Sequence, residues 1–318
     1  MSNMIRHLFG LTLTDVQRSS SGRGGLHALV DIWGLLRIHN WVKNLTLLLP
    51  VFFAGMMFSL SREQAFRLGM TMLGFCFTSS FIYIINDIRD VEFDRLHPRK
   101  RNRPIASGRV GIRQALAVSF ALLMLAAGCM YFLSWEIRLF MMLYLAMNVL
   151  YCFGMKNIAI VDVSSISLGF VLRLLAGGYA CEVAITHWII ILVFLLMFSI
   201  ALAKRRDDLV LTRDAVQNLR KSQKGYNLQF IDIAKSISFS VTLVAYMIYS
   251  VSEDVMARFG SRYLYVTSLP VFLGIMRYLQ ISIVYKQSGS PVNLLLKDWF
   301  IKTVIAVWIL MFFIILYV

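Results

Sequence analysis

Long apolar segments alternate with short charged ones along almost the whole chain. Nine of the apolar segments approach the ~20 residues that a helix needs to cross a bilayer. They cover residues 44–60, 67–86, 114–133, 139–154, 158–181, 188–203, 236–252, 263–283 and 299–318. Because a helix satisfies its own backbone hydrogen bonds inside lipid, this pattern predicts an all-α polytopic membrane protein with a nine-helix bundle.

The hydrophilic connections are too short to form a separate soluble domain. The two longest cover residues 87–113 and 204–235. The N-terminal stretch is rich in Ser, Gly and Arg, which predicts flexibility. We therefore expect a flexible basic segment over residues 1–35 and a single nine-helix membrane domain over residues 36–318.

Composition agrees with a membrane protein, and the distribution of charge sets the expected orientation. The chain is 58% hydrophobic with only 15% charged residues, against roughly 25% charged in a soluble domain. Lys and Arg number 32 against 17 acids; 24 of these bases fall on the side of the N-terminus and five on the other. The positive-inside rule then predicts a cytoplasmic N-terminus and a C-terminus on the opposite side of a bacterial-type cytoplasmic (inner) membrane. This distribution argues against nucleic-acid binding.

Acidic side chains cluster where the second apolar segment ends, in the sequence NDIRDVEFD. Asn86, Asp90 and Asp94 are four residues apart, so on a continuing helix they lie along one face at intervals of about 6 Å. Asp87 lies on the flank of that face. Mg²⁺ prefers one or two carboxylates together with phosphate and water. The spacing therefore predicts a site for Mg²⁺ and a diphosphate, with a solvated loop of paired charges as the alternative.

The same segment carries a family resemblance. NDIRDVEFD resembles the NDxxDxxxD signature of the UbiA-type intramembrane prenyltransferase superfamily. Four further stretches resemble its decaprenyl-phosphate phosphoribosyltransferase branch. They are RIHNWVKN (37–44), HPRKRNRPIASG (97–108), KNIAIVDVSSISLGFVLRLLAGG (156–178) and LAKRRDDL (202–209). The likeness runs in order over about residues 35 to 318.

The resemblance implies a nine-helix fold and an enzyme that acts on a lipid. That branch transfers a 5-phosphoribosyl group from 5-phosphoribosyl-1-diphosphate to a polyprenyl phosphate and releases diphosphate. Carried over residue by residue, the resemblance implies that Asn86, Asp90 and Asp94 hold a catalytic Mg²⁺, with Asp87 as a neighbouring metal ligand.

Basic residues depart from the wider superfamily in a way that fits this branch. Superfamily members that use prenyl diphosphates have a second Asp-rich motif after the sixth helix, where this chain has Lys204 to Arg206 ahead of two acids. A phosphoribosyltransferase brings two anions together, which requires fixed cations. The predicted substrate-binding residues are Arg37, Lys43, Asn44, Arg101, Arg103, Lys156, Arg173, Lys204, Arg205 and Arg206.

Structural roles for these residues, and two other functions, stay open at this point. The bases also suit membrane topology and contact with anionic lipid, and Lys43 suits an interfacial anchor. Arg173 lies inside an apolar segment, and Asp162 is on nearly the same helical face as a partner. The alternative enzyme moves a polyprenyl group from its diphosphate to an aromatic or quinone-precursor acceptor. A non-enzymatic membrane transporter is the remaining alternative.

Overall fold

The structure is a computed structural model that describes residues 25–96, 100–211, 225–285 and 297–317. These residues form helices joined by turns, and no strand occurs among them. The helices, with η for 3₁₀, are α3 (Gly25–Leu36), η1 (Ile38–Leu48), α4 (Leu49–Phe53), α5 (Arg62–Arg89), α6 (Val91–Leu96), η2 (Lys100–Asn102), α7 (Ile112–Tyr131), α8 (Trp135–Phe153), η3 (Met155–Asn157), α9 (Val161–Ala180), α10 (His187–Leu211), α11 (Leu228–Val251), α12 (Glu253–Phe259), η6 (Leu264–Thr267), α13 (Ser268–Ile283) and α15 (Trp299–Tyr317).

Seven helical stretches of the described chain are long and apolar enough to cross a membrane. They are α5, α7, α8, α9, α10, α11 and the stretch Leu264–Ile283, which consists of η6 followed by α13. A shorter apolar stretch, Trp299–Ile315, lies in α15. The chain is thus an all-α, multi-pass membrane protein, as predicted. The predicted count of nine spans is not confirmed.

The first predicted span, residues 44–60, is not one continuous helix. The chain runs through η1 into the short helix α4, and the amide of Leu49 donates to the carbonyl of Thr46 in a 3₁₀ pattern. Pro50 has no amide hydrogen, so it cannot form the α-helical hydrogen bond to the carbonyl of Thr46. After α4, Gly55 adopts a positive φ of 68°, and the amide of Met56 donates to the carbonyl of Val51. This Schellman turn ends the helix.

The N-terminal segment contains a helix that the sequence pattern did not predict. Helix α3 covers residues 25–36, within and just beyond the expected flexible segment. Leu35 is fully buried and packs in a core with Ile84 and Ile88 of α5. This apolar contact anchors the chain just before Arg37. The rest of the expected flexible segment, residues 1–24, lies outside the described residues.

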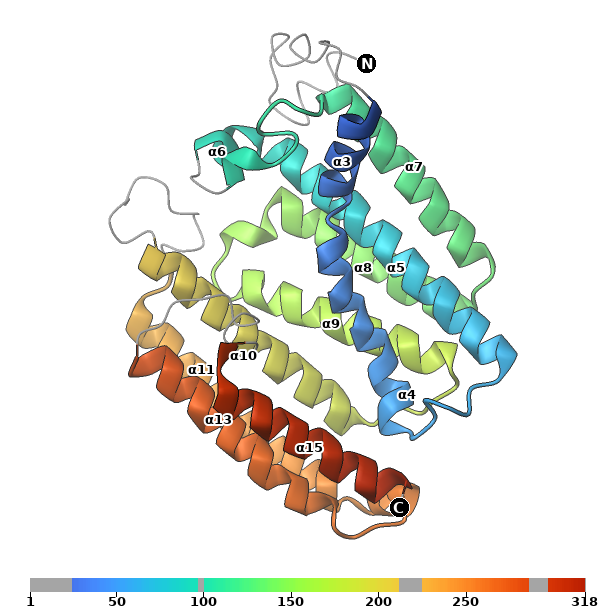
Figure 1. Ribbon diagram of the computed structural model, residues 1–318, viewed down its shortest axis with the longest axis vertical. Coiled ribbons are helices and arrows are strands. Elements are labelled where there is room, and N and C mark those ends of the chain that lie inside the picture. The colour runs from blue at the N-terminus through green and yellow to red at the C-terminus, as the bar shows by residue number, and fades with distance from the viewer. Residues whose placement is uncertain (1–24, 97–99, 212–224, 286–296, 318) are drawn as a thin grey trace. The chain divides into compact units, whose positions relative to one another are not determined.

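Two compact units divide the chain, and each is described by itself below. Unit 1 comprises residues 1–49, 60–152 and 175–182, and unit 2 comprises residues 50–59, 153–174 and 183–318. In unit 1, α5 packs along α7 (Figure 1). In unit 2, α10 packs along α11, and α13 along α15 (Figure 1). The predicted single domain over residues 36–318 stays a prediction.

Candidate functional site

The NDIRDVEFD segment lies at the end of α5 in unit 1. Helix α5 ends at Arg89, and Asp90 has φ −92° and ψ 8° before α6 begins. Helical hydrogen bonds nevertheless continue, because the amide of Asp90 donates to the carbonyl of Asn86 and that of Asp94 to the carbonyl of Asp90, at 2.9 and 2.8 Å. The helical register on which the predicted metal site depends is therefore kept across a local break.

Two arginines bind the carboxylates of this segment. Arg37 Nη2 donates to both oxygens of Asp87, at 2.5 and 2.6 Å. Arg103 Nη1 lies between two carboxylates, 3.0 Å from Asp87 Oδ1 and 2.5 Å from Asp94 Oδ2. Asp87 and Asp94 are each only 3% exposed. We call these four residues the carboxylate–arginine cluster; its two negative and two positive charges balance.

The backbone before α5 holds Arg37 in place. Arg37 adopts the left-handed conformation, with φ 51° and ψ 48°, which is uncommon for a residue other than glycine. Ser80 Oγ of α5 donates to the carbonyl of Leu36 and accepts from Trp41 Nε1. These two bonds fix the chain on either side of Arg37 against α5, so its guanidinium group faces Asp87.

A compact turn after η2 holds the backbone of Arg103. The carbonyl of Arg103 accepts from the amide and from the hydroxyl of Ser107, at 2.9 and 2.8 Å. Pro104, Ile105 and Ala106 are buried, so the turn packs on its own apolar residues. Gly108 closes it at a φ of 75°, a conformation that glycine adopts without strain. Arg103 therefore has a fixed backbone and a half-buried side chain.

The predicted metal ligands are residue types that suit Mg²⁺, but in the structure they contact other groups of the protein. Asn86 Nδ2 donates to Asp90 Oδ2 at 3.2 Å, and Asn86 Oδ1 lies 3.7 Å from Cys152 Sγ. No group of three or more Asp, Glu, His or Cys side chains in the described residues converges as a metal site. Mg²⁺ needs only one or two carboxylates when a phosphate completes its shell, and the oxygen-rich set here fits that requirement. The assignment of Asn86, Asp87, Asp90 and Asp94 as metal ligands stays a prediction.

Lys43 and Asn44 lie in η1 of unit 1, close to α5. Lys43 Nζ is 3.3 Å from Tyr83 Oη and 5.7 Å from the centre of that ring. The Arg37 guanidinium lies over the same ring, at 5.3 Å. Asn44 is fully buried and donates to Cys76 Sγ at 3.1 Å. Tyr83 thus links two predicted substrate-binding cations, while Asn44 is part of the packing against α5.

Arg205 belongs to a buried hydrogen-bond network inside unit 2. Arg205 Nε donates to Asp162 Oδ2 at 2.6 Å, and Tyr226 Oη donates to Asp162 Oδ1 at 2.7 Å. The amide of Ile160, a residue with a strained φ of 69°, donates to Tyr226 Oη. Burial and the hydrogen bond to Asp162 raise the pKa of Tyr226. The tyrosine therefore stays protonated and keeps its donor role.

Arg206 belongs to a second buried network in unit 2. Arg206 Nε and Lys235 Nζ both contact Asp232 Oδ1, at 2.9 and 3.0 Å. Lys235 also donates to Ser282 Oγ at 2.7 Å and is fully buried. Arg206 Nη1 is buried without a hydrogen-bond partner among the described residues. This second network combines two cations with a single shared carboxylate oxygen.

The structure places the remaining predicted residues in different environments. Arg101 is exposed in η2, and Lys204 is exposed on α10. Lys156 is buried in η3. Arg173 donates to the carbonyl of Gly169 and lies over the ring of Phe170, whereas Asp162, its expected partner, binds Arg205 instead.

The expected loop boundaries also change. Helix α10 continues to Leu211, so Lys204, Arg205 and Arg206 lie on a helix and not in a loop. Residues 97–99 and 212–224, parts of the two predicted long loops, lie outside the described residues.

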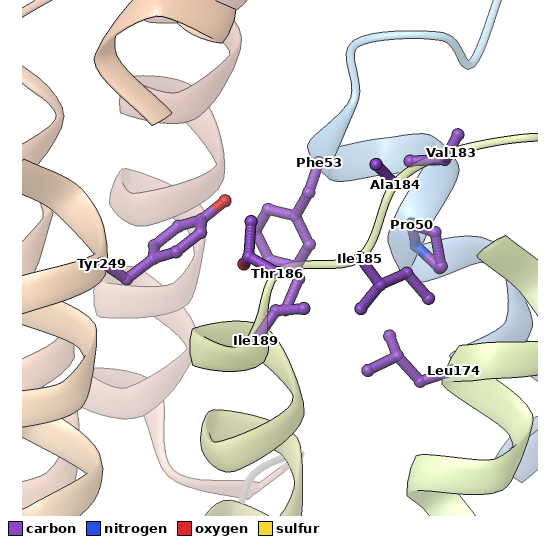
Figure 2. A pocket seen from close by; sticks show the side chains of 9 residues that line it. All are labelled: Pro50, Phe53, Leu174, Val183, Ala184, Ile185, Thr186, Ile189 and Tyr249. Atoms are coloured by element: carbon purple, nitrogen blue, oxygen red, sulfur yellow. The ribbon is translucent and has the colours of Figure 1, made fainter. Parts of the chain in front are cut away.

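A small pocket in unit 2 is unrelated to the predicted site. Apolar side chains and Tyr249 line most of it (Figure 2). None of its lining residues is a predicted site residue. The candidate chemistry therefore lies in the polar clusters and not in this pocket.

Sequence reasoning missed two tyrosines and two partners at these clusters. Tyr83 precedes Asp87 by four residues, so its place on the same helical face was a usable signal. Asp232 and Lys235 are three residues apart on α11, so helical spacing was a signal for their contact. The partner of Tyr226 on α9 and that of Asp232 on α10 lie far away along the chain, and no local pattern pairs them.

Comparison with known proteins defines the class to which this membrane protein belongs. The UbiA prenyltransferase family matches residues 47–301. The chain therefore belongs to the UbiA prenyltransferase family and is an enzyme of that family, a membrane transferase.

Within that class, the chain is similar to phosphoribosyltransferases. It is 30% identical to the decaprenyl-phosphate phosphoribosyltransferase of Mycolicibacterium smegmatis, over 86% of this chain and 88% of that protein. It is 29% identical to the enzyme of the same name from Mycobacterium tuberculosis, over 86% and 90% of the two chains. Among solved structures, a UbiA homolog from Archaeoglobus fulgidus bound to DMAPP and Mg²⁺ has a TM-score of 0.67 at 20% identity, covering 90% of this chain and 99% of that one. That likeness confirms the UbiA fold.

Proposed function

We propose that this protein transfers a 5-phosphoribosyl group from 5-phosphoribosyl-1-diphosphate to a polyprenyl phosphate of the decaprenyl type, with release of diphosphate. The observation that carries the proposal is the contact of Arg103 with Asp94, 2.5 Å long, at the end of α5. It puts a guanidinium group, which suits phosphate, directly beside a carboxylate that suits Mg²⁺. The names of the mycobacterial relatives support this choice of substrates.

Asn86, Asp90 and Asp94 would hold Mg²⁺, with Asp87 beside them. When bound, Mg²⁺ supplies positive charge that neutralises the departing diphosphate. Asp87 is held by two arginines, so its main contribution is to orient Arg37 and Arg103. Both guanidinium groups then lie at the same helix end as the ligands.

Bond making and bond breaking follow from the charges of the reactants. The C1–O bond to diphosphate breaks as the ribose gains oxocarbenium character, and an oxygen of the lipid phosphate forms a new bond to C1 from the opposite face. The configuration at C1 is therefore inverted. Since the lipid phosphate is already ionised at neutral pH, no general base is required. What the protein must supply is cations that hold two anions together.

The predicted cations occur in each of the two units. Arg37, Lys43, Arg101 and Arg103 lie in unit 1, and Lys156, Arg173 and Lys204 to Arg206 lie in unit 2. Arg205 and Arg206 are already paired with Asp162 and Asp232, so we assign them to the electrostatic framework. We assign direct phosphate contact to the exposed Lys204 and Arg101 and to Arg103 at the end of α5.

We place the reaction at the cytoplasmic face of a bacterial-type inner membrane. The end of α5 that carries the acids leads into the basic segment 87–113, which the charge asymmetry predicts to be cytoplasmic. The soluble, highly charged sugar diphosphate then reaches the site from the cytoplasm, while the prenyl chain stays in lipid.

A second candidate is the transfer of a prenyl group from its diphosphate to an aromatic acceptor. The Archaeoglobus fulgidus homolog bound to DMAPP and Mg²⁺ favours it. Against it, α10 carries Lys204, Arg205 and Arg206 where acids would be needed for a second metal–diphosphate contact. Phosphoribosyl transfer therefore ranks first.

The direct test incubates purified protein with phosphoribosyl diphosphate, a polyprenyl phosphate and Mg²⁺ and detects the phosphoribosylated lipid by mass spectrometry. Asp90→Asn and Asp94→Asn should each abolish turnover, because each removes a carboxylate from the metal site. Glu92→Gln is the matched control, since Glu92 is exposed on the same segment and should leave turnover intact. Product from a polyprenyl diphosphate and an aromatic acid would instead support the second candidate.

A further inference from the structure

The position of Arg103 between two buried carboxylates suggests more than a static clamp. Its Nη1 contacts Asp87 at 3.0 Å and Asp94 at 2.5 Å. Two carboxylates that converge on one point with little solvent access repel each other unless a cation lies between them. In the structure, the guanidinium group of Arg103 provides that cation.

Arg37 makes the two carboxylates unequal. It binds both oxygens of Asp87, so Asp87 keeps a counter-ion whatever Arg103 does. For Asp94, in contrast, Arg103 is the only cationic side chain in contact among the described residues. Release of Arg103 would therefore affect Asp94 more than Asp87.

We propose that Arg103 is an exchange residue: it occupies the cation position on Asp94 until Mg²⁺ and the sugar diphosphate arrive together, and then moves to the diphosphate. This inference deepens the proposed function, on which its substrate readout rests. Asp94 would then hold Mg²⁺ in place of the guanidinium group, and the guanidinium group of Arg103 would bind the negative charge that the diphosphate adds. No covalent bond changes in the exchange.

The turn around Arg103 suits such a movement. Its backbone is fixed through Ser107 and a buried apolar core, so the exchange needs only a rotation of the side chain. That side chain is 24% exposed, against 5% for the side chain of Asp94, which leaves its stem partly outside the packed interior. Arg is suited to both positions because its planar fork binds carboxylate and phosphate alike.

The balanced charge of the carboxylate–arginine cluster has a consequence for metal affinity. While Arg103 is in place, a divalent cation must displace it to reach Asp94, so metal alone binds weakly. Diphosphate removes that competition by offering Arg103 a second anion. Metal and sugar diphosphate should therefore each strengthen the binding of the other, by the same factor.

Arg103→Gln separates this exchange from a simple clamp because the two readouts move in opposite directions. Without substrate, the full-length variant should bind Mn²⁺, followed by electron paramagnetic resonance, about tenfold more tightly than the wild type, since a competing charged hydrogen bond is gone. Its KM for phosphoribosyl diphosphate should rise about tenfold, because the same group is missing from the diphosphate. Arg113→Gln, which removes an exposed charge from the first turn of α7, should leave the Mn²⁺ affinity unchanged.

Arg103→Lys keeps the test decisive if the Gln variant does not fold. A lysine keeps the positive charge but is a shorter side chain with a single nitrogen. The Mn²⁺ affinity of this variant should therefore lie between those of the wild type and Arg103→Gln. An affinity equal to or below that of the wild type in the folded variants would overturn the exchange. Because Mn²⁺ binding needs no substrate, tighter binding without phosphoribosyl transfer would retain the exchange and reject only the proposed substrate.

Discussion

Asp298 combines two stabilising contacts at the start of α15. Its Oδ1 accepts from the amide of Ile301, which caps the helix, and Arg277 Nη2 donates to its Oδ2 at 2.9 Å. The hydrogen bond from Arg277 lowers the pKa of Asp298. A carboxyl group whose pKa is lower in the folded than in the unfolded protein stabilises the fold above its unfolded pKa, and this contribution is lost as the pH falls through the folded pKa.

Variants at Asp298 should separate the cap from the charge. Asp298→Ala removes both contacts and should lower the free energy of unfolding by about 1 kcal/mol or more at pH 7. Asp298→Asn keeps an acceptor for Ile301 and should lose less. Below pH 4 the wild type and the Asn variant should converge, as measured by unfolding midpoints in detergent across a pH series. A gap that persists at low pH would show that the charge of Asp298 contributes nothing.

The Asp162–Arg205 pair predicts a large effect from a single substitution. Asp162 is fully buried and Arg205 is 4% exposed. Asp162→Leu removes the buried counter-ion of Arg205 and leaves it Asp208, a partly exposed carboxylate 3.1 Å from Arg205 Nη1. The variant should therefore destabilise unit 2 by about 3 kcal/mol. The double variant Asp162→Leu with Arg205→Met should recover much of this loss, since an apolar pair can replace a buried ion pair. Graded SDS titrations measure both, and a double variant no more stable than the single one would refute this account.

The arrangement of the acidic side chains was predictable from sequence because helical spacing is local. Asn86, Asp90 and Asp94 follow a helical spacing, and the structure keeps their register. The partners of Asp87 were not predictable in this way, because Arg37 lies 50 residues away and reaches Asp87 through a left-handed turn. Arg205 was expected to bind phosphate, but it pairs with Asp162, 43 residues earlier. Pairings of this kind depend on packing that no local pattern encodes.

At the scale of helices, runs of apolar residues predicted the long spans. They did not predict where proline and glycine interrupt a helix. The segment that became α5 was predicted from its run of apolar residues, and it forms one continuous helix because its interior holds no proline. The segment over residues 44–60 has a similar apolar content, yet Pro50 and Gly55 divide it. Helix α3 was missed because charge and glycine content suggested flexibility, whereas burial of Leu35 stabilises it.

A close helix contact in unit 1 depends on the absence of one side chain. A Cβ added at Gly177, near the end of α9, would lie 2.8 Å from the carbonyl carbon of Leu47 in η1 and still closer to its oxygen. Gly177→Ala should therefore push the two elements apart and destabilise the protein by about 1–3 kcal/mol. Gly128→Ala on α7 is the control, since its Cβ would meet no atom within 4 Å and alanine favours a helix by about 1 kcal/mol. Equal thermal midpoints for the two variants would exclude this close contact.

At the scale of the whole molecule, the uneven distribution of bases predicts which membrane face carries the chemistry. In the predicted nine-span topology, 24 Lys and Arg fall on one side and five on the other, and the side with the excess is expected to be cytoplasmic. All four native cysteines are buried, and burial raises the pKa of Cys181 to about 11. Introduced cysteines should therefore report on topology with little background from the native thiols.

Two exposed positions, one at the start of α5 and one beyond its acidic end, allow the orientation of this helix to be tested by cysteine labelling. Glu63 lies in the first turn of α5, and Asn102 lies beyond the acidic end of that helix, in η2. In intact spheroplasts, a membrane-impermeant maleimide should label Glu63→Cys at once and Asn102→Cys only after the membrane is opened. The reverse pattern would put the carboxylate–arginine cluster outside the cell, away from the cytoplasmic sugar diphosphate that the proposed reaction needs. Labelling of both sites in intact spheroplasts would mean that α5 does not cross the membrane.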